Sequence, residues 1–101
     1  MTVGTDIIVL AAAKAKPGKE AELERAWREV AAPTRAQPGC VQFSLLRSTE
    51  DRAIFVGFER WESEEDHQTH LQGAHMQKLM GRMAELLAEP LTVVAYEVLD
   101  D

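Results

Sequence analysis

The apolar positions in the first part of the chain follow two patterns. A continuous apolar run from Asp6 to Ala13 is closed by the turn residues KPGK at 16–19, which predicts a buried strand followed by a turn. From Lys19 to Ala32 the apolar residues recur three and four positions apart, as they do on the buried stripe of an amphipathic helix. Pro33 and the QPG sequence at 37–39 are expected to end this helix.

The middle of the chain predicts a hairpin and the start of a second helix. Cys40 to Arg47 and Ala53 to Trp61 are strand-like runs separated by a short polar segment, a spacing typical of a β-hairpin. Ser63 is followed three residues later by Asp66, which resembles a capping box, and acidic residues suit the positive end of a helix dipole. A helix is therefore expected to begin near Ser63.

The last part of the chain completes the predicted fold. Gly73 is expected to break or bend the helix, a second amphipathic piece extends over 76–87, Pro90 stops it, and a last strand follows over 91–99. The resulting order, βαββαβ, is that of an α+β ferredoxin-like sandwich, in which both helices cover one face of a four-stranded sheet. Residues 1–101 are expected to form a single domain.

The predicted strands are apolar on both faces, although a half-exposed sheet normally alternates apolar and polar residues. In the third strand Ile54, Val56 and Phe58 point to one face, and Phe55 points to the other. Because two helices cover only one face, the other would be a large exposed apolar patch, which monomers rarely tolerate. The same face of a second copy can cover it, so we expect a homodimer with the two sheets packed face to face.

Composition and charge narrow the class of protein. Hydrophobic residues make up 46% of the 101 residues and charged residues 28%, the balance of a globular domain rather than of a disordered chain. The net charge of −6 argues against nucleic acid or an anionic membrane surface as a partner. The single cysteine, Cys40, excludes an internal disulfide, and the sequence has neither a secretory signal pattern nor a membrane-length apolar segment. A cytoplasmic protein is therefore expected.

The stretch WESEEDHQTHLQGAHM, from Trp61 to Met76, contains all three histidines of the chain. His67 and His70 lie three positions apart and can share a helix face, and His75 follows beyond the glycine. Imidazole and carboxylate groups can bind zinc or iron, but H-x-x-H-x-x-x-x-H is not an established ligand spacing. We therefore expect no metal site; solvated histidines at the start of a helix are the simpler interpretation.

Other catalytic and cofactor patterns are also missing from the sequence. No glycine-rich phosphate loop is present, no serine has the surroundings of a nucleophile elbow, and Cys40 has no histidine close in sequence. No cofactor is therefore expected. Trp61, Trp27 and the methionines of the second helical region either fill the core or wall a cavity between sheet and helices, and the residues alone leave both interpretations open.

The run FERWESEEDHQTHLQGAHMQKL, over 58–79, resembles the antibiotic biosynthesis monooxygenase family. That family has an aromatic-Glu-x-Trp sequence at the end of the third strand, an acidic helix start, and then His-Leu-x-x-x-His. The matching residues are Phe58, Glu59, Trp61, His70, Leu71, His75 and Met76. Segments 16–27 and 38–40 also fit, so the resemblance covers nearly the whole chain. It implies a dimeric α+β barrel, in agreement with the fold and dimer expected above.

The branches of this family differ in chemistry: some oxidise anthrones or quinols without a cofactor, some degrade haem, and some isomerise a phosphorylated signal. The haem-degrading branch uses an asparagine, and this chain contains none. The anthrone branch uses an asparagine upstream of the strand-end tryptophan and a tyrosine in the next helix, and Gly57 and His67 stand at those places. The likeness is greatest to the small quinol monooxygenases and their uncharacterised relatives.

The resemblance implies a cofactor-free monooxygenase that acts on a small phenol, quinol or anthrone-type ring with molecular oxygen. An electron-rich phenolate or enolate can reduce oxygen once the protein has removed a proton and excluded water. The expected roles are base for His70 or His75, ring contact for Trp61 with Phe55 or Phe58, hydrogen bonding for His67, and anion stabilisation for Arg82. The alternatives are an isomerase or non-redox binder of a small metabolite in the same cavity, and a scaffold without catalysis.

Overall fold

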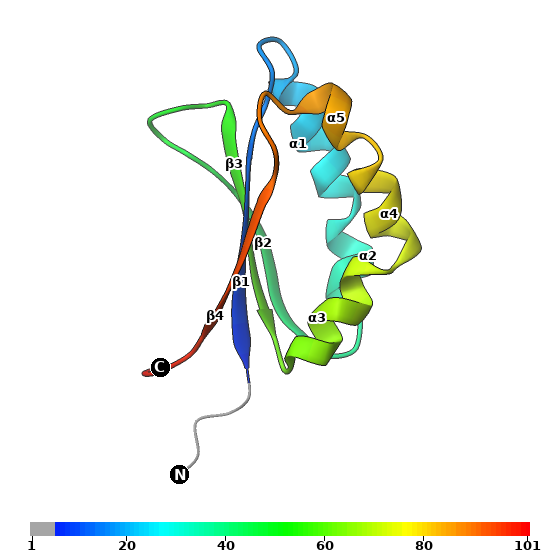
Figure 1. The fold of residues 1–101 in the computed structure, drawn as a ribbon, viewed down its shortest axis with the longest axis vertical. Helices are drawn as coiled ribbons and strands as arrows, with labels where there is room; N and C mark the ends of the chain where they lie inside the picture. The colour runs from blue at the N-terminus through cyan, green and yellow to red at the C-terminus, as the bar shows by residue number, and fades with distance from the viewer. Residues whose placement is uncertain (1–5) are drawn as a thin grey trace.

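The computed structural model describes residues 6–101 and shows one sheet with all the helices on one of its sides (Figure 1). The elements are β1 (Ile7–Lys14), α1 (Glu20–Glu29), α2 (Ala31–Arg35), β2 (Cys40–Arg47), β3 (Ile54–Trp61), α3 (Glu64–Leu71), α4 (Ala74–Met80), α5 (Met83–Leu86) and β4 (Thr92–Glu97). Within these residues no helix has the length and apolar character needed to cross a membrane. The single-domain and signal-sequence predictions also involve residues 1–5, which lie outside the described residues.

The sheet has the strand order β2-β3-β1-β4, and each neighbouring pair is antiparallel. β1 lies in the middle and pairs with β3 on one side and β4 on the other, so Ile7 is aligned with both Trp61 and Glu97. This topology confirms the predicted α+β ferredoxin-like sandwich. It places the C-terminal end of β3, where Trp61 lies, next to the start of β1.

The first predicted helix differs from the structure at its C-terminal end. The chain forms two helices, with Val30 between them, and remains helical as far as Arg35. The expectation that Pro33 ends the helix is wrong, because Pro33 lies in the first turn of α2, where backbone N–H groups have no partner within the helix. The chain turns instead at Gly39, whose φ of 81° is favourable for glycine.

The core lies between the sheet and the helices, and β3 shows the division between the two faces. Phe55, Gly57, Glu59 and Trp61 are buried on the helix side, whereas the residues between them are partly exposed on the outer side. The largest fully buried side chains are Trp61, Phe55, Leu23, Leu86, His70, Val9 and Thr34. A histidine among them, and Glu59 on the same side, place polar groups inside the core.

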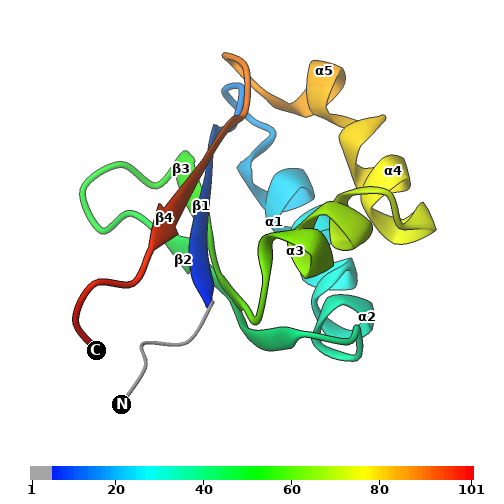
Figure 2. The ribbon, with the colours of Figure 1, turned by 60° about the horizontal axis from the view of Figure 1, so that its bottom comes forward.

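The outer face of the sheet is uncovered by any described element of this chain (Figure 2). Every residue of β4 is exposed, and Val94 and Tyr96 are 46% and 49% exposed. The register pairs Tyr96 with Ile8 and Val94 with Leu10, so these side chains form one apolar surface across two strands. Large apolar side chains therefore face solvent where the sequence predicted a second copy.

Candidate functional site

The N-terminal cap of α3 sets the direction in which its histidines point. The Ser63 hydroxyl accepts a hydrogen bond from the Asp66 backbone N–H (3.1 Å) and donates one to the Asp66 carboxylate (2.9 Å), which confirms the predicted cap. Gly39 packs against Asp66, since a Cβ at position 39 would lie 2.2 Å from Oδ2. The helix therefore begins against the start of β2, and its inward face buries His67 and His70.

The structure brings all three histidines together with the strand-end tryptophan. The ring centroid of His70 lies 4.8 Å from that of Trp61, 6.1 Å from that of His67 and 5.8 Å from that of His75. His70 is 0% exposed and occupies the middle of this cluster. The sequence predicted that His67 and His70 can share a helix face, but the interpretation of solvated histidines is wrong for these two residues, which are 5% and 0% exposed.

Two contacts define the state of the His70 ring. Its Nδ1 lies 2.7 Å from the amide oxygen of Gln37, an acceptor, so Nδ1 carries the hydrogen and donates it. The other nitrogen, Nε2, is buried without a hydrogen-bond partner among the described residues. Burial, assisted by the neighbouring His67 and His75, lowers the pKa of His70 to about 4. At neutral pH the imidazole is uncharged, and Nε2 presents a lone pair.

Glu59 is the group that this lone pair faces, and the sequence reasoning gave it no role in catalysis. Its Oε1 lies 3.7 Å from His70 Nε2 and accepts a hydrogen bond of 2.9 Å from Trp61 Nε1. Its Oε2 makes no hydrogen bond with the described residues. The residue is 4% exposed. Burial raises its pKa to about 7, although the bond from Trp61 acts in the opposite direction.

Glu59 and His70 are close enough for an ion pair, but burial opposes both charges. A raised carboxyl pKa and a lowered imidazole pKa together favour the neutral pair, with the proton on Glu59. Above a pH of about 7 the carboxyl loses this proton while the imidazole stays neutral. The pair thus supplies a carboxylate that is basic near neutral pH, which is the property a general base needs.

A small pocket lies between the sheet and the helices beside this pair. Its lining consists of Ala11, Trp27, Glu59, His67, Leu71, Met76, Leu79, Met80, Met83, Leu91 and Val93. The space open to the centre of a water-sized molecule is about 20 Å³, room for about one water. A ring-sized ligand therefore needs the lining side chains, among them three flexible methionines, to move apart.

Of the residues that the sequence nominated for the site, His67 is the one that reaches this lining. Trp61 and His70 are buried in the core and do not line the pocket. Trp27, not Trp61, provides its aromatic wall. Burial lowers the pKa of His67, an effect that Glu64 partly offsets. The imidazole of His67 makes no hydrogen bond with the described residues, so its ring nitrogens remain available to a ligand.

The two phenylalanines nominated to hold a ring lie elsewhere. Phe55 is buried in the core, and the guanidinium of Arg47 lies 4.8 Å from its ring centroid. Phe58 belongs to the outward-facing set of β3, so the sheet separates it from Trp61 and the histidines. Neither residue is in the pocket lining.

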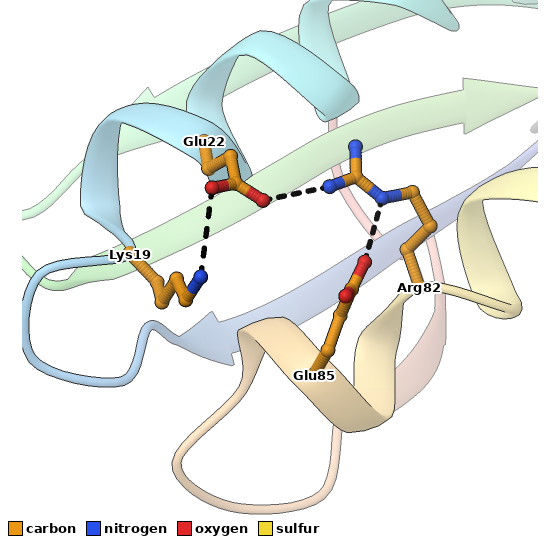
Figure 3. Close-up of polar contacts among 4 residues, drawn as sticks. All are labelled: Lys19, Glu22, Arg82 and Glu85. Atoms are coloured by element: carbon orange, nitrogen blue, oxygen red, sulfur yellow. Dashed lines mark hydrogen bonds and ion pairs between the residues drawn. The ribbon is translucent and has the colours of Figure 1, made fainter.

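Arg82 and His75 also make contacts away from the pocket lining. Arg82 pairs with Glu22 of α1 at 2.8 Å and with Glu85 of α5 at 2.9 Å, and Lys19 pairs with the same Glu22 (Figure 3). It therefore connects two helices at the surface. The Nε2 of His75 lies 3.2 Å from the hydroxyl of the buried Thr34 in α2, which orients the ring beside His70.

Gly57, at the place where the anthrone branch carries an asparagine, has no room for a side chain. A Cβ there would lie 2.9 Å from Cζ2 of Trp27 and 3.6 Å from Oε2 of Glu59. The indole therefore packs directly on the strand backbone. The polar group beside this position is the carboxylate of Glu59.

Among residues 6–101, no group of three or more His, Cys, Asp or Glu side chains is arranged to hold a metal ion. The Nδ1 of His70 and the Nε2 of His75 are already engaged by Gln37 and Thr34. These two nitrogens are thus tied to neighbouring groups, whereas Glu59 and His67 line the pocket, and Glu59 Oε2 and the His67 ring make no hydrogen bond with the described residues.

Comparison with known proteins places this fold and site in context. The profile of the antibiotic biosynthesis monooxygenase family matches residues 6–82. The Bacillus subtilis protein named "Putative monooxygenase YcnE" is 32% identical over 92 residues, covering 91% of this chain and 97% of that protein. Rv0793 from Mycobacterium tuberculosis superposes with a TM-score of 0.90 at 27% identity, covering 95% of this chain and 97% of that chain. PA3566 from Pseudomonas aeruginosa gives 0.90 at 26% identity, covering 99% and 100%.

Proposed function

Because the chain belongs to the antibiotic biosynthesis monooxygenase family, we propose that it is a monooxygenase that oxidises a small phenol, quinol or anthrone-type ring without a cofactor. The observation that carries this proposal is the pocket beside Glu59. Its walls are apolar apart from one carboxyl and one imidazole, and both of these residues line the same space. An apolar ring that bears one weakly acidic hydrogen fits such a lining.

The charge of the pocket separates this substrate class from the alternative of a phosphorylated metabolite. The lining contains no lysine or arginine, whereas phosphate recognition relies on such cations. Arginines do gather in another, open hollow formed by Arg28, Arg47 and Arg52, but Glu24 of the same hollow already pairs with the first two. A non-redox binder of an uncharged ring fits the same lining, and a test with oxygen separates it from an enzyme.

The proposed reaction needs no external reductant, because the substrate supplies all four electrons that oxygen accepts. A ring CH₂ becomes a carbonyl, one oxygen atom of O₂ enters the product, and the other leaves as water with the two hydrogens removed. The protein removes the first proton, holds the ring and keeps bulk water away from the radical pair. Trp27 and the methionines provide the apolar walls, and His67 hydrogen-bonds an oxygen of the ring. His70 and His75, nominated as bases, lie outside the lining and act through their neighbours.

We further propose that the working unit is a homodimer formed through the outer face of the sheet. In a monomer, the apolar surface that includes Val94 and Tyr96 would be a contiguous patch exposed to solvent. A second copy packed on this face would bury the patch.

Oxygen uptake tests the proposed function. Purified protein is added to a panel of quinols and anthrones in an oxygen-electrode cell, and we expect uptake above the uncatalysed rate with at least one ring. Boiled protein serves as the control. A second measurement finds the concentrations of each ring compound that raise the melting temperature of the protein. Oxygen uptake at the background rate with the whole panel at those concentrations would favour the non-redox binder.

A further inference from the structure

We propose that Glu59 is the catalytic residue that removes the substrate proton, and that His70, held by Gln37, is the positioning residue that keeps this carboxyl basic. The inference rests on the proposed function, because it assigns the proton acceptor of that same pocket. It differs from the sequence-based expectation, which gave the role of base to a histidine.

Access to the pocket is the first reason. Glu59 and His67 are the two polar residues of the lining, and the other members are apolar. Oε1 of Glu59 is held by the indole N–H of Trp61 at 2.9 Å, whereas Oε2 has no hydrogen bond among the described residues. One oxygen therefore fixes the carboxylate in place, and the other is free to accept a proton from a bound ring.

The orientation of His70 is the second reason. Gln37 accepts the Nδ1 hydrogen at 2.7 Å, so the unpartnered Nε2 turns its lone pair toward Oε1 of Glu59 at 3.7 Å. A lone pair opposite a carboxylate disfavours the anion and favours the acid. In the other tautomer Nε2 would carry the hydrogen, donate it to the carboxylate and make Glu59 a weaker base.

The described ionisable groups around Glu59 include histidines and a thiol, and Arg35 of α2, which acts on the same thiol, is bound to the Phe43 carbonyl. His67 and His70 face Glu59 from α3. His75 of α4 lies beside His70, and Cys40 lies on β2. Burial lowers the pKa of both α3 histidines, so these two rings are neutral near pH 7. Burial and the neighbouring Glu59 raise the pKa of the Cys40 thiol, an effect that Arg35 partly offsets, so the thiol too is neutral. Glu59, with a pKa of about 7, therefore changes its charge near neutral pH.

The step itself is a proton transfer without any redox change. The acidic O–H or C–H bond of the ring breaks, its electron pair stays on the substrate as phenolate or enolate, and the proton bonds to Oε2 of Glu59. His67 donates a hydrogen bond to the substrate oxygen on which the negative charge collects. The electron-rich anion then meets oxygen, and the proton on Glu59 is available for the water that leaves.

Hydrogen exchange under anaerobic conditions tests this step apart from oxidation. Anthrone is incubated with the protein in D₂O without oxygen, and loss of its methylene hydrogens is followed by NMR. We expect wild-type protein to accelerate exchange over buffer, with a rate that rises between pH 6 and 8 around a midpoint near 7. Glu59→Gln, which keeps an acceptor for Trp61, is expected to reduce the catalysed rate by about 100-fold or more. Glu85→Gln, the same change at an exposed surface pair, is the matched control and is expected to exchange like wild type.

Gln37→Ala provides a second variant at a half-buried position outside the core. Freed from Gln37, His70 can adopt the other tautomer, so we expect the midpoint of the exchange profile to move to lower pH. Exchange by wild type no faster than buffer, or by Glu59→Gln as fast as wild type, overturns the inference. If the protein catalyses exchange but takes up no oxygen in air, the proposed oxygenase function fails and Glu59 remains the base. If the protein takes up oxygen and Glu59→Gln does not reduce the rate, the assignment of the base fails and the oxygenase function remains.

Discussion

Glu59 and His70 share a buried space in which neither side chain is stabilised as an ion. The ordinary pKa values are 4.5 for the carboxyl and 6.5 for the imidazole, and in the folded protein they become about 7 and about 4. Between pH 4.5 and 6.5 the unfolded pair holds one proton on His70, and the folded pair holds one proton on Glu59. Because the two states bind equal numbers of protons there, the pair adds no pH dependence to stability in that range.

Removing one member of the pair is expected to reveal the pH dependence of the other. In Glu59→Gln, unfolding releases His70 to take up a proton, so the free energy of unfolding falls as pH drops from 6.5 to 4. The loss relative to wild type reaches about 3 kcal/mol, at about 1.4 kcal/mol for each unit of pKa. Urea unfolding of both proteins across this range measures it. If the free energy of unfolding depends on pH in the same way for both proteins, the pair does not exchange a proton on folding.

The sequence indicated the region of the site but not the residue that reaches the pocket. The three histidines stand out in the sequence because imidazole is chemically active, and the structure groups them. In the sequence, Glu59 belongs to the aromatic-Glu-x-Trp pattern that resembles the family. The signal that identifies it is its register: every second residue of β3 faces inward, so Glu59 lies on the same side as Phe55, Gly57 and Trp61. A carboxylate in that series is buried, and burial is what makes it basic.

At the scale of elements, α1 and β3 meet at Gly57, where the strand contributes no side chain. The indole of Trp27 lies on the strand backbone there and also forms a wall of the pocket. The same contact fixes how far the helix layer stands from Glu59.

Gly57→Ala is therefore expected to destabilise the fold. Its Cβ would lie 2.9 Å from Trp27 Cζ2, and such overpacking costs about 1–3 kcal/mol. Gly81→Ala is the matched control: its φ of −63° suits alanine and its nearest neighbours lie at 3.5 Å, so we expect no loss. Thermal unfolding of the two variants checks this. Equal melting temperatures would show that the indole moves aside freely.

The surface ion pairs of Arg82 give a contrasting prediction. Arg82 joins α1 to α5 through Glu22 and Glu85 and is 38% exposed, so we expect Arg82→Ala to cost less than about 1 kcal/mol. Because Arg82 lies outside the pocket lining, oxygen uptake by this variant is expected to match that of wild type. A large fall in the rate with an unchanged melting temperature would restore Arg82 to the reaction.

The elements themselves were predictable where local chemistry decides them. β2 spans the predicted residues, and the cap at Ser63 starts α3 as expected, because strand alternation and capping are local properties. Pro33 misled the prediction because proline ends a helix in its interior but is tolerated in a first turn. Whether α2 began anew at Ala31 depended on tertiary packing that no local pattern records.

At the scale of the whole molecule, the sheet has one face in the core and one apolar face in solvent. Ile8 and Leu10 of β1 are aligned with Tyr96 and Val94 of β4 on that outer face. The surface is continuous across the strands, and no described helix covers it (Figure 2). A second copy is the occupant that we propose.

A charge placed in this face is expected to separate the copies. Tyr96→Glu would put a carboxylate into the apolar interface without a partner, so we expect sedimentation to show a dimer for wild type and a monomer for the variant. Gln72→Glu, an equal change of charge at an exposed position after α3, is the control and is expected to remain dimeric. A wild-type protein that sediments as a monomer at micromolar concentration would contradict the dimer.

The most direct test of the oxygenase is the fate of the oxygen atoms, since uptake alone does not distinguish an oxygenase from an enzyme that makes peroxide. The wild-type protein is supplied with ¹⁸O₂ and a ring compound that it oxidises, and the mass of the product is measured by mass spectrometry. We predict one ¹⁸O atom in each product carbonyl formed, with no peroxide released. A product without the label, formed together with peroxide, would contradict the account.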